Sequence, residues 1–417
     1  MALATLKEII ENGAYKDVAL RRILAQESHL NPTQRAFVTE VVSGVMRNLL
    51  LLDHTLQTFS KTPINRIKTQ VLHILRLAVY QIKFMDKVQD YAAINEAVEM
   101  AKKSGFGGLS GFVNGILRNI ARAEGLPETD DLSIKYSIQP WIVEHFTAEL
   151  GEETTRELLE NITAKPPKIT ICINTNKTTA DRLTQILEAE GVSVTPANVD
   201  GMLTITKTAN IAALPSFNQG LYHIMDEAAA HAIHAAKPPK NAKIIDVCAA
   251  PGGKSFLAAY LTGDGGQILA CDIHDHKIKL LKEGANRLSI KNFTAELADA
   301  RQHRKDLEET ADLVIMDMPC SGLGTLRRKP DIKQTKQPEA IEELAKLSRE
   351  IFEACWKYAK IGGKILFSTC TIAKAENADN VDWALANFPL KLEVQEQILP
   401  QTMNTDGFFI AVMTRAT

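Results

Sequence analysis

The sequence of 417 residues has no apolar run near the roughly 20 residues that a membrane-spanning helix needs. Its first residues, MALATLKEIIENGAYKD, carry acidic side chains and no long apolar stretch, unlike a secretory signal peptide. Its six cysteines form no CxxC pair, which argues against a zinc site or a disulfide framework and favours reduced thiols. We therefore expect a cytoplasmic protein with no membrane partner and no bound metal.

The sequence also has little net charge, −2 at pH 7, so the overall charge gives no signal for nucleic acid. The charges are unevenly distributed, however. Residues 1–120 contain 15 basic and 10 acidic side chains, whereas the rest of the chain contains 33 and 40. A basic first third is typical either of a surface that contacts phosphates or of an ordinary solvated helical surface.

The first part of the chain, residues 1–125, is predicted to form an all-α domain. Apolar residues recur at spacings of three and four in residues 35–59 and 67–85. The stretch NPTQRAFV supplies an N-cap and an early proline, as a helix start does. A polar, proline-containing segment follows at 125–140 and indicates a linker, and residues 130–235 mix one clear strand with helical patterns. We expect a small α+β domain there.

The last part of the chain, residues 236–417, alternates strands and helices after a boundary at KPPKN. Strands are expected at 243–248, 267–272, 293–297, 311–317 and 364–370, helices at about 253–262, 274–289, 338–359 and 376–387, and a final strand in GFFIAVM. This alternation predicts an α/β, Rossmann-like, doubly wound parallel sheet. Such a sheet binds ligands at the carboxyl ends of its strands.

The turn after the first of these strands, DVCAAPGGKS, is rich in small residues that let the backbone approach a ligand. It is neither GxGxxG nor a P-loop, so it does not favour dinucleotides or triphosphates. It fits the methionine part of S-adenosylmethionine, or a mere sharp turn. Asp272, Asp299 and Asp317 end successive strands, where carboxylates can bind a nucleoside. Each alone is more typical of a helix N-cap.

Two cysteines, Cys320 and Cys370, follow the fourth and fifth strands, which are neighbours in the expected order. A single cysteine is usually a small buried apolar residue, an interpretation that suits Cys172 and Cys355. A pair at the ligand-binding edge favours chemistry instead. A thiolate that adds to carbon 6 of cytosine makes carbon 5 nucleophilic enough to take a methyl group. Asp317 could supply the proton for this addition, and Lys254 would favour the thiolate.

Together these motifs resemble those of the RNA cytosine-5 methyltransferases, in particular the bacterial 16S ribosomal RNA enzymes with a NusB-like N-terminal domain. The resemblance covers nearly the whole chain and is least clear at 130–235. It is carried by DVCAAPGGKS, DMPCSGLGTLRRKPDIK, FSTCTI, ENADNV and DGFFIAV, and by the helical stretches RAFVTEVVSGVMR, ILRLAVYQI and AINEAVEMAKKSGFGGLSGFVNGILRNI. One departure is Met318, where the family usually has alanine; it affects the packing of the pocket and leaves the reacting groups in place.

The resemblance implies a NusB-like RNA-binding domain at 1–125, a small RNA-contacting α+β domain at 130–235 and a Rossmann-like methyltransferase domain at 236–417. It implies Cys370 as the nucleophile and Cys320 as the residue that assists product release. Asp317 would contact the base, with Lys254 beside it. The expected contacts to S-adenosylmethionine are Cys248, Ala249, Ala250, Pro251, Gly252, Gly253, Lys254, Asp272, Asp299 and Asp317.

The implied partner is 16S ribosomal RNA, naked or in a partly assembled small subunit, and the implied target is cytosine 967. A target base inside a helix would have to be extruded from its stack. The basic run RRKPD at 327–331 is either a solvated loop or a phosphate contact.

Three other functions remain open at this point. DNA cytosine-5 methyltransferases use the same addition chemistry, but their nucleophile is the cysteine of the PC motif. The NusB-like third alone would fit a non-catalytic RNA-binding or antitermination factor, against which the cofactor motifs argue. A dehydrogenase is disfavoured because the chain lacks GxGxxG.

Overall fold

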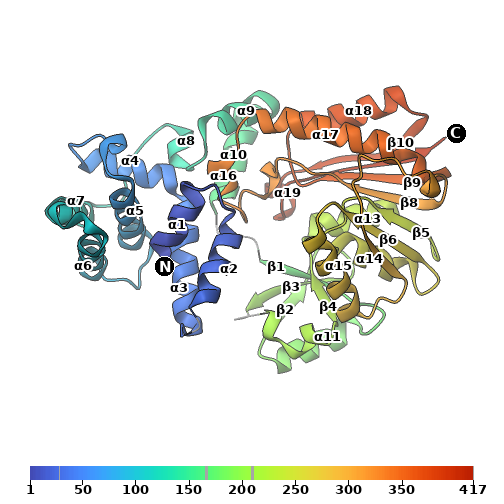
Figure 1. The fold of residues 1–417 in the computed structure, drawn as a ribbon, viewed down its shortest axis with the longest axis horizontal. Helices are drawn as coiled ribbons and strands as arrows, with labels where there is room; N and C mark the ends of the chain where they lie inside the picture. The colour runs from blue at the N-terminus through green and yellow to red at the C-terminus, as the bar shows by residue number, and fades with distance from the viewer. Residues whose placement is uncertain (28, 165–167, 208–210, 417) are drawn as a thin grey trace. The chain divides into compact units, whose positions relative to one another are not determined.

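A computed structural model describes residues 1–27, 29–164, 168–207 and 211–416 (Figure 1). The chain forms two compact units. The helical unit comprises Met1–Ala164 together with Lys329–Gln337, and the α/β unit comprises Lys165–Arg328 with Pro338–Thr417. Among the described residues, no helix is both long and apolar enough to cross a membrane.

The helical unit confirms the predicted all-α start of the chain. Its helices are α1 (Ala2–Ile10), α2 (Lys16–Gln26), α3 (Pro32–Arg47), α4 (Leu49–Phe59), α5 (Thr69–Phe84), α6 (Asp90–Ala101), α7 (Ser110–Arg122), α8 (Leu132–Lys135), α9 (Pro140–Leu150), α10 (Glu152–Thr163) and α16 (Ile332–Thr335). Helix α3 begins at the predicted cap: the Asn31 side chain accepts a hydrogen bond from the backbone N of Gln34 at 2.9 Å, and Pro32 occupies the first turn.

By their contacts, α8 to α10 belong to the helical unit, although the sequence groups residues 130–235 into one domain. The backbone N of Leu50 in α4 donates to the Ser137 hydroxyl just after α8, at 2.8 Å. α9 and α10 pack against each other. The linker expected at 125–140 therefore contains a short helix, and the division into three domains stays a prediction.

The segment 329–337 of the helical unit carries a buried lysine. The Lys333 side chain is 0% exposed, and its ammonium has the carbonyl of Tyr136 as a partner at 3.5 Å. The nearby Asp331 accepts a hydrogen bond from the backbone N of Lys16 at 3.1 Å. Burial, with a smaller effect of the Arg47 charge, lowers the pKa of Lys333 to about 7. The segment is therefore anchored in the helical unit at an electrostatic cost.

Lys333→Met is accordingly expected to raise the free energy of unfolding at pH 7 by about 1–4 kcal/mol, because it removes a poorly compensated buried charge. In the unfolded chain the pKa of a lysine is about 10.4, so between pH 7 and 10 the unfolded state binds the extra proton. The native protein thus gains stability as the pH rises, and the advantage of the variant shrinks. Calorimetric melts at pH 6.5 and 9 measure both effects. The exposed Lys87→Met is the control, and equal shifts in both variants would contradict the prediction.

The α/β unit begins with a four-stranded antiparallel sheet of order β2-β3-β1-β4. Its elements are β1 (Ile169–Ile173), α11 (Ala180–Ala189), β2 (Ser193–Pro196), β3 (Met202–Lys207), α12 (Pro215–Asn218) and β4 (Tyr222–Ile224). The one clear strand expected within residues 130–235 is β1, and α11 is one of the helical patterns expected there. Helix α13 (Glu227–Ala236) leads from this sheet to the next.

The second sheet has seven strands in the order β10-β11-β9-β8-β5-β6-β7. Its elements are β5 (Lys243–Asp246), α14 (Gly253–Thr262), β6 (Gln267–Asp272), α15 (Asp275–Leu288), β7 (Phe293–Leu297), β8 (Ala311–Asp317), α17 (Glu339–Cys355), β9 (Ala359–Thr369), α18 (Ala378–Asn387), β10 (Leu390–Ile398), α19 (Pro400–Met403) and β11 (Phe408–Arg415). Strands β5 to β9 are parallel, and β11 is antiparallel to both β9 and β10. The predicted order of the five parallel strands and the Rossmann-like class are confirmed.

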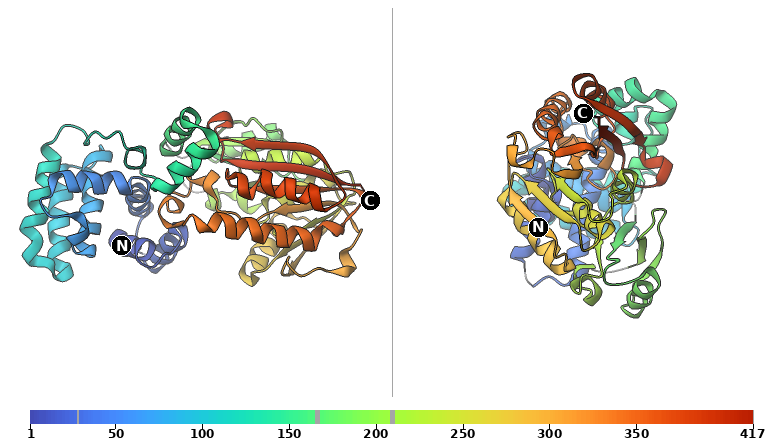
Figure 2. Two further views of the ribbon diagram at one scale, coloured as in Figure 1. Left: turned by 90° about the horizontal axis from the view of Figure 1, so that it is seen from above. Right: turned by 90° about the vertical axis from the view of Figure 1, so that its right-hand side faces the viewer.

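Buried side chains alternate between the two faces of this sheet, as the period of two requires. Along β8, Leu313 and Ile315 pack with α13 and α14, whereas Val314 and Met316 pack with α17 and α18. The layers and their helices can be followed in Figures 1 and 2. Strand β10 is absent from the sequence prediction, although its residues alternate in burial.

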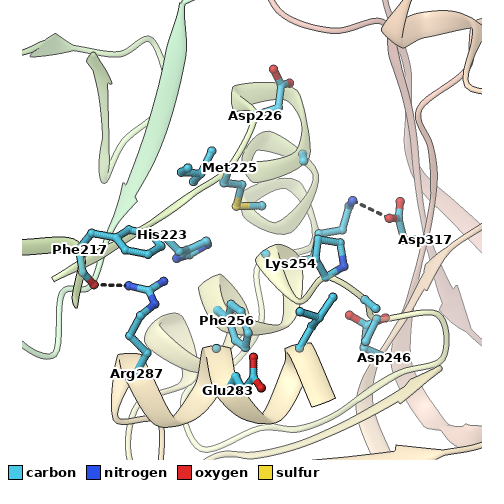
Figure 3. A pocket seen from close by; sticks show the side chains of 18 residues that line it. Phe217, His223, Met225, Asp226, Asp246, Lys254, Phe256, Glu283, Arg287 and Asp317 are labelled. Atoms are coloured by element: carbon cyan, nitrogen blue, oxygen red, sulfur yellow. Dashed lines mark hydrogen bonds and ion pairs between the residues drawn. The ribbon is translucent and has the colours of Figure 1, made fainter. Parts of the chain in front are cut away.

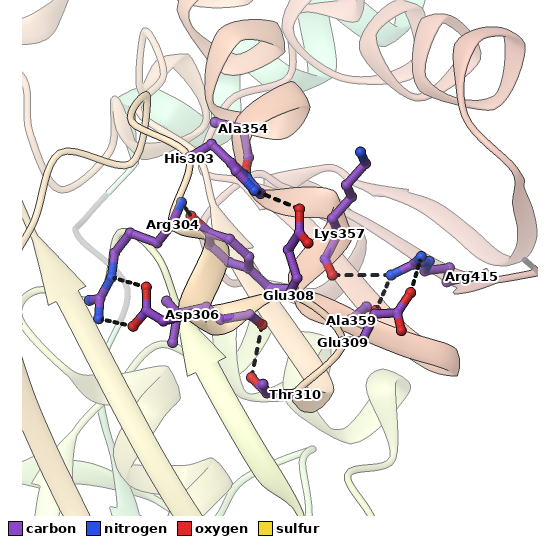
Figure 4. A network of polar contacts seen from close by, with 12 residues as sticks. His303, Arg304, Asp306, Glu308, Glu309, Thr310, Ala354, Lys357, Ala359 and Arg415 are labelled. Carbon is purple, nitrogen blue, oxygen red and sulfur yellow. Dashed lines mark hydrogen bonds and ion pairs between the residues drawn. The ribbon is translucent and has the colours of Figure 1, made fainter.

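A polar network closes the edge of the sheet where the parallel strands begin (Figure 4). Arg415, at the end of β11, donates to the carbonyls of Lys357 at 3.1 Å and Ala359 at 2.7 Å, and pairs with Glu309 at 2.8 Å. These contacts hold the last strand to the start of β9. The opposite end of the sheet, where the parallel strands end, is where a ligand can bind.

Candidate active site

The sequence-predicted residues gather at the carboxyl edge of the parallel strands. Asp272 and Asp317 are the last residues of β6 and β8, and Asp299 lies two residues beyond β7. Cys370 directly follows β9, and Cys320 follows β8 by three residues. In the register of β8 and β9, Asp317 lies opposite Ser368. The pairing of neighbouring parallel strands therefore brings both cysteines to the same place.

The two thiols are in contact: Cys320 Sγ lies 3.3 Å from Cys370 Sγ. Both side chains are partly buried. The hydrogen bond with Cys370, together with burial and the negative charges nearby, raises the pKa of Cys320 well above its ordinary value. Cys320 is thus held as a thiol that can donate its proton to the sulfur of Cys370. The predicted proximity of the two cysteines is found in the structure.

An ion pair lies beside the thiols. Lys254 Nζ, at the start of α14, is 2.8 Å from Asp317 Oδ2, and the Ser368 hydroxyl donates to Asp317 Oδ1 at 2.9 Å. Burial alone would lower the pKa of Lys254, but the Asp317 carboxylate, with smaller contributions from Asp246 and then Cys370, raises it. The ammonium also lies over the ring of Phe408, 4.9 Å from its centre. Lys254 is therefore a fixed positive charge that is paired with Asp317 and interacts electrostatically with Cys370.

The glycine-rich turn from Cys248 to Lys254 is tightly packed. Gly252 has φ +110°, a conformation that favours glycine, and a Cβ there would lie 2.4 Å from Cζ of Phe256. Burial raises the pKa of the Cys248 thiol well above its ordinary value, so this thiol stays protonated. The turn consequently presents backbone, not a reactive thiol, to whatever lies over the strand ends.

The two outer carboxylates already have protein partners. Asp272 is 5% exposed, accepts a hydrogen bond from the backbone N of His274 at 3.1 Å and faces Lys277 Nζ at 3.5 Å. Arg301 binds both oxygens of Asp299, through Nε at 2.9 Å and an amino nitrogen at 2.7 Å, and this hydrogen bonding lowers the pKa of Asp299. A ligand at Asp299 would have to share the carboxylate with Arg301.

A cavity of about 600 Å³ borders the glycine-rich turn (Figure 3). Its wall includes Ala249, Ala250, Pro251, Gly253, Lys254 and Asp317 on one side, and Phe217, His223, Met225, Phe256 and Arg287 on the other. Its volume is in the range of small-molecule sites. Asp272, Asp299 and the two paired cysteines are not part of this wall.

The structure adds site residues that sequence reasoning missed. Asp246, which ends β5 and begins the quoted motif, accepts a hydrogen bond from Ser255 at 2.5 Å, while its other oxygen has no partner among the described residues. Burial raises its pKa to about 7. The buried Glu376 accepts hydrogen bonds from Ser321, next to Cys320. Asp246 and Glu376 each begin a motif quoted above, DVCAAPGGKS and ENADNV, so both could have been noticed there, although nothing local pairs Glu376 with Ser321.

The two arginines of the basic run after Cys320 have partners within the protein, whereas Lys329 is exposed, and a phosphate contact of this run stays a prediction. Arg328 binds two carboxylates, those of Asp406 at 2.9 Å and Asp226 at 2.9 Å. Arg327 donates to the Asn404 side chain at 2.6 Å. These contacts fix the loop that carries Cys320 onto the segment before β11.

Three family models match the chain. Residues 233–414 match 16S rRNA methyltransferase RsmB/F, residues 1–122 match the NusB family, and residues 139–212 match the ferredoxin-like domain of RsmF/B-like methyltransferases. The probable ribosomal RNA small subunit methyltransferase B of Bacillus subtilis is 34% identical, with 100% of this chain and 98% of that protein covered. The ribosomal RNA small subunit methyltransferase B of Shewanella oneidensis is 30% identical, with 100% and 99% covered.

Solved structures agree with the fold. The crystal structure of PH0851 superposes with a TM-score of 0.83 at 26% identity and covers 99% of this chain and 98% of that one. NSun6 from Pyrococcus horikoshii with SFG gives a TM-score of 0.61 at 20% identity and covers 67% of this chain and 98% of that one. At this identity the second likeness shows the fold alone.

Proposed function

The chain belongs to the RsmB/F family of 16S rRNA methyltransferases, and we propose that it methylates carbon 5 of a specific cytosine in small-subunit ribosomal RNA. S-adenosylmethionine is the methyl donor of the family. The observation that carries the carbon-5 assignment is the contact of two thiols, 3.3 Å apart, beside a fixed Lys254–Asp317 ion pair. Addition of a thiolate to carbon 6 is the chemistry that activates carbon 5 of a pyrimidine.

The residues at the strand ends fit this donor. A sulfonium-bearing nucleoside has ribose hydroxyls and a positive charge, and it lacks phosphates. Carboxylates at the ends of β6 and β8, together with a turn that exposes backbone, suit those groups better than they suit a polyphosphate. We assign the segment from Cys248 to Lys254, with Asp272, Asp299 and Asp317, to its binding. Bound there, the donor supplies an electrophilic methyl group.

Cys370 acts as the nucleophile in this proposal. The Lys254 ammonium interacts electrostatically with Cys370 and favours its thiolate. The thiolate forms a bond to carbon 6 of the cytosine, and the ring nitrogen must then receive a proton. Asp317, which is paired with Lys254 and hydrogen-bonded by Ser368, is placed to contact the base: as the carboxylic acid it gives a proton to the ring nitrogen, and it takes that proton back when the base is released.

Cys320 serves the last step. After methyl transfer, the electrons of the C5–H bond form the C5–C6 double bond, and the bond from carbon 6 to Cys370 breaks. The departing sulfur takes the proton of the Cys320 thiol, which in turn receives the proton from carbon 5. The surplus proton of the overall reaction is then on Cys370 and passes to solvent. The 3.3 Å contact permits this exchange without movement of the backbone.

The substrate in this proposal is 16S ribosomal RNA, naked or partly assembled, with cytosine 967 as the target suggested by the family resemblance. The NusB-like residues 1–125 and the small domain at 130–235 would contact RNA, and residues 236–417 would carry the reaction. An enzyme that adds a thiol to carbon 6 needs the face of the base, so the target must be unpaired or extruded.

Bisulfite sequencing of ribosomal RNA tests the assignment. A strain without this protein should lose one 5-methylcytosine in 16S RNA, and the wild-type gene, but not the Cys370→Ala variant, should restore it. An unchanged methylation map would rule out this target. Calorimetry with S-adenosylmethionine separates the alternatives: a purely RNA-binding factor would release no heat.

A further inference from the structure

The site contains a buried carboxylate with no role in the proposed chemistry. Glu376 ends the short 3-10 turn Lys374–Glu376, six residues after Cys370, and is 1% exposed. One of its oxygens accepts the backbone N–H of Ser321 at 2.7 Å, and the other accepts the Ser321 hydroxyl at 2.5 Å. That hydroxyl is also 2.8 Å from the hydroxyl of Thr371. The Ser321 and Thr371 side chains are as deeply buried as Glu376.

The two hydroxyl groups in the hydrogen-bonded network of Glu376 belong to direct neighbours of the two cysteines in the chain. Ser321 directly follows Cys320, and Thr371 directly follows Cys370. Consecutive Cα atoms are only about 3.8 Å apart, so fixing each neighbour largely fixes each cysteine. Glu376 therefore joins two loops that leave different strands.

A second contact brings the same loops together through the backbone. The backbone N of Gly324 donates to the carbonyl of Cys370 at 3.1 Å. A Cβ at Gly324 would lie 2.8 Å from the carbonyl oxygen of Cys370, so the two loops pack here without side chains. This contact uses the Cys370 carbonyl and Gly324, three residues after Ser321, so it joins the same two loops as the side chains of the Glu376 network do next to the cysteines.

The charges around the two thiols differ. The Glu376 carboxylate is one of the negative groups that, after the hydrogen bond with Cys370 and burial, raise the pKa of Cys320. The Lys254 ammonium instead interacts with Cys370. A negative group on one side and a positive group on the other favour a thiol at Cys320 and a thiolate at Cys370.

We propose that Glu376 is a positioning residue, which holds the Cys320 thiol against the Cys370 sulfur for the step that frees the methylated base. The catalytic consequence of this inference rests on the proposed function. The positioning of the two thiols by Glu376 does not depend on that function. Loss of the Glu376 charge should leave the binding of RNA and of S-adenosylmethionine intact, since the hydrogen bonds described for its carboxylate go to Ser321, outside the glycine-rich turn and the Lys254–Asp317 pair.

Glu376→Gln is the direct test, because it keeps the shape and turns one acceptor oxygen into a donor that faces the Ser321 N–H or hydroxyl. We expect kcat for RNA methylation to fall about 100-fold, as for a small misplacement of reacting groups, and KM for RNA to fall with it, so that kcat/KM is kept, because only the release step is slowed. Covalent protein–RNA complex should accumulate during turnover. The exposed Glu343→Gln on α17 is the matched control.

A second readout needs no methylation. Diamide oxidises two neighbouring thiols to a disulfide and is itself reduced to the hydrazine. In the RNA-free wild-type protein it should join Cys320 to Cys370 rapidly, as seen by peptide mass spectrometry. In Glu376→Gln this reaction should be several-fold slower, because the sulfur atoms are no longer held together. The rate depends on positioning and is insensitive to a change in RNA affinity.

Thr371→Val covers the case in which Glu376→Gln does not fold, since it removes only the link to the Cys370 loop. Thr371→Val should lower kcat and slow disulfide formation, as Glu376→Gln does, but by smaller factors. Wild-type kcat and a wild-type disulfide rate in a folded variant would overturn the proposal. If the wild-type protein methylates no RNA, the proposed function fails, yet the comparison of disulfide rates still decides whether Glu376 positions the thiols.

Discussion

Cys370→Ala is expected to abolish methyl transfer, with kcat at least about 10³-fold lower, as for removal of the nucleophile from other enzymes that form covalent intermediates. Without a thiolate on carbon 6, carbon 5 of cytosine is too weak a nucleophile to take the methyl group. Transfer of a tritiated methyl group from S-adenosylmethionine to 16S RNA measures the loss. The binding of S-adenosylmethionine should be unchanged.

The geometry singles out Cys370 over the other thiols. It directly follows β9, and the Lys254 ammonium interacts with it. The thiols of Cys172 and Cys355 are buried, and burial raises the pKa of each to about 12, so neither yields a thiolate at neutral pH. Cys172→Ala is therefore the matched control and should keep full activity.

A DNA-type arrangement would reverse the roles of the two cysteines. In that case Cys320→Ala would abolish methyl transfer and Cys370→Ala would retain it. This pair of results would move the nucleophile to Cys320 and contradict the proposed mechanism. Loss of activity in both variants, with a covalent complex in neither, would mean that the addition step itself needs both thiols.

The parts of the site that follow from strand order were predictable from the sequence. Short apolar runs that alternate with helical segments located β5, β6, β8 and β9, and in a doubly wound sheet this order alone puts Cys320 beside Cys370. The glycine-rich turn and the aspartates at the strand ends are local features of the sequence. Their position at the edge follows from the same topology, whereas their roles stay predictions.

The other parts depend on contacts between residues far apart in the chain. Glu376 meets Ser321 across 55 positions, and Arg328 meets Asp226 across 102, so no window of sequence pairs them. The anchoring of Lys333 near Tyr136 spans 197 positions. The spacing of apolar residues predicts which face of a helix or strand is buried. It does not predict which polar residue from another part of the chain will contact that face.

The same limit explains the basic run after Cys320. Charge in a loop predicts phosphate contact when the side chains are free, but Arg328 is held by two carboxylates of its own chain. One partner, Asp406, begins the quoted motif DGFFIAV, and the other, Asp226, directly precedes α13, but nothing in the sequence pairs either of them with Arg328. The guanidinium consequently acts within the fold, where it fixes the loop that carries Cys320.

Cys320→Ala should also lower turnover strongly, but by blocking release of the methylated RNA and not by blocking methyl transfer. Cys370 can still add to the cytosine and methyl transfer can still occur once, but the departing sulfur lacks the proton donor that lies 3.3 Å away in the wild type. We expect a single burst of about one methyl group per protein, followed by turnover at least about 10²-fold slower. The trapped protein–RNA complex should survive denaturation in SDS.

A gel-shift of end-labelled RNA in SDS, together with the stoichiometry of methyl transfer, measures both parts of this expectation. The double variant Cys320→Ala/Cys370→Ala should form no complex, because the bond that is trapped is the one to Cys370. Cys320→Ser should be intermediate, since a hydroxyl can donate a hydrogen bond but is a far weaker acid than a thiol. Steady turnover of Cys320→Ala without any covalent complex would show that release proceeds without the second thiol, and the contact between the two sulfur atoms would then have no part in product release.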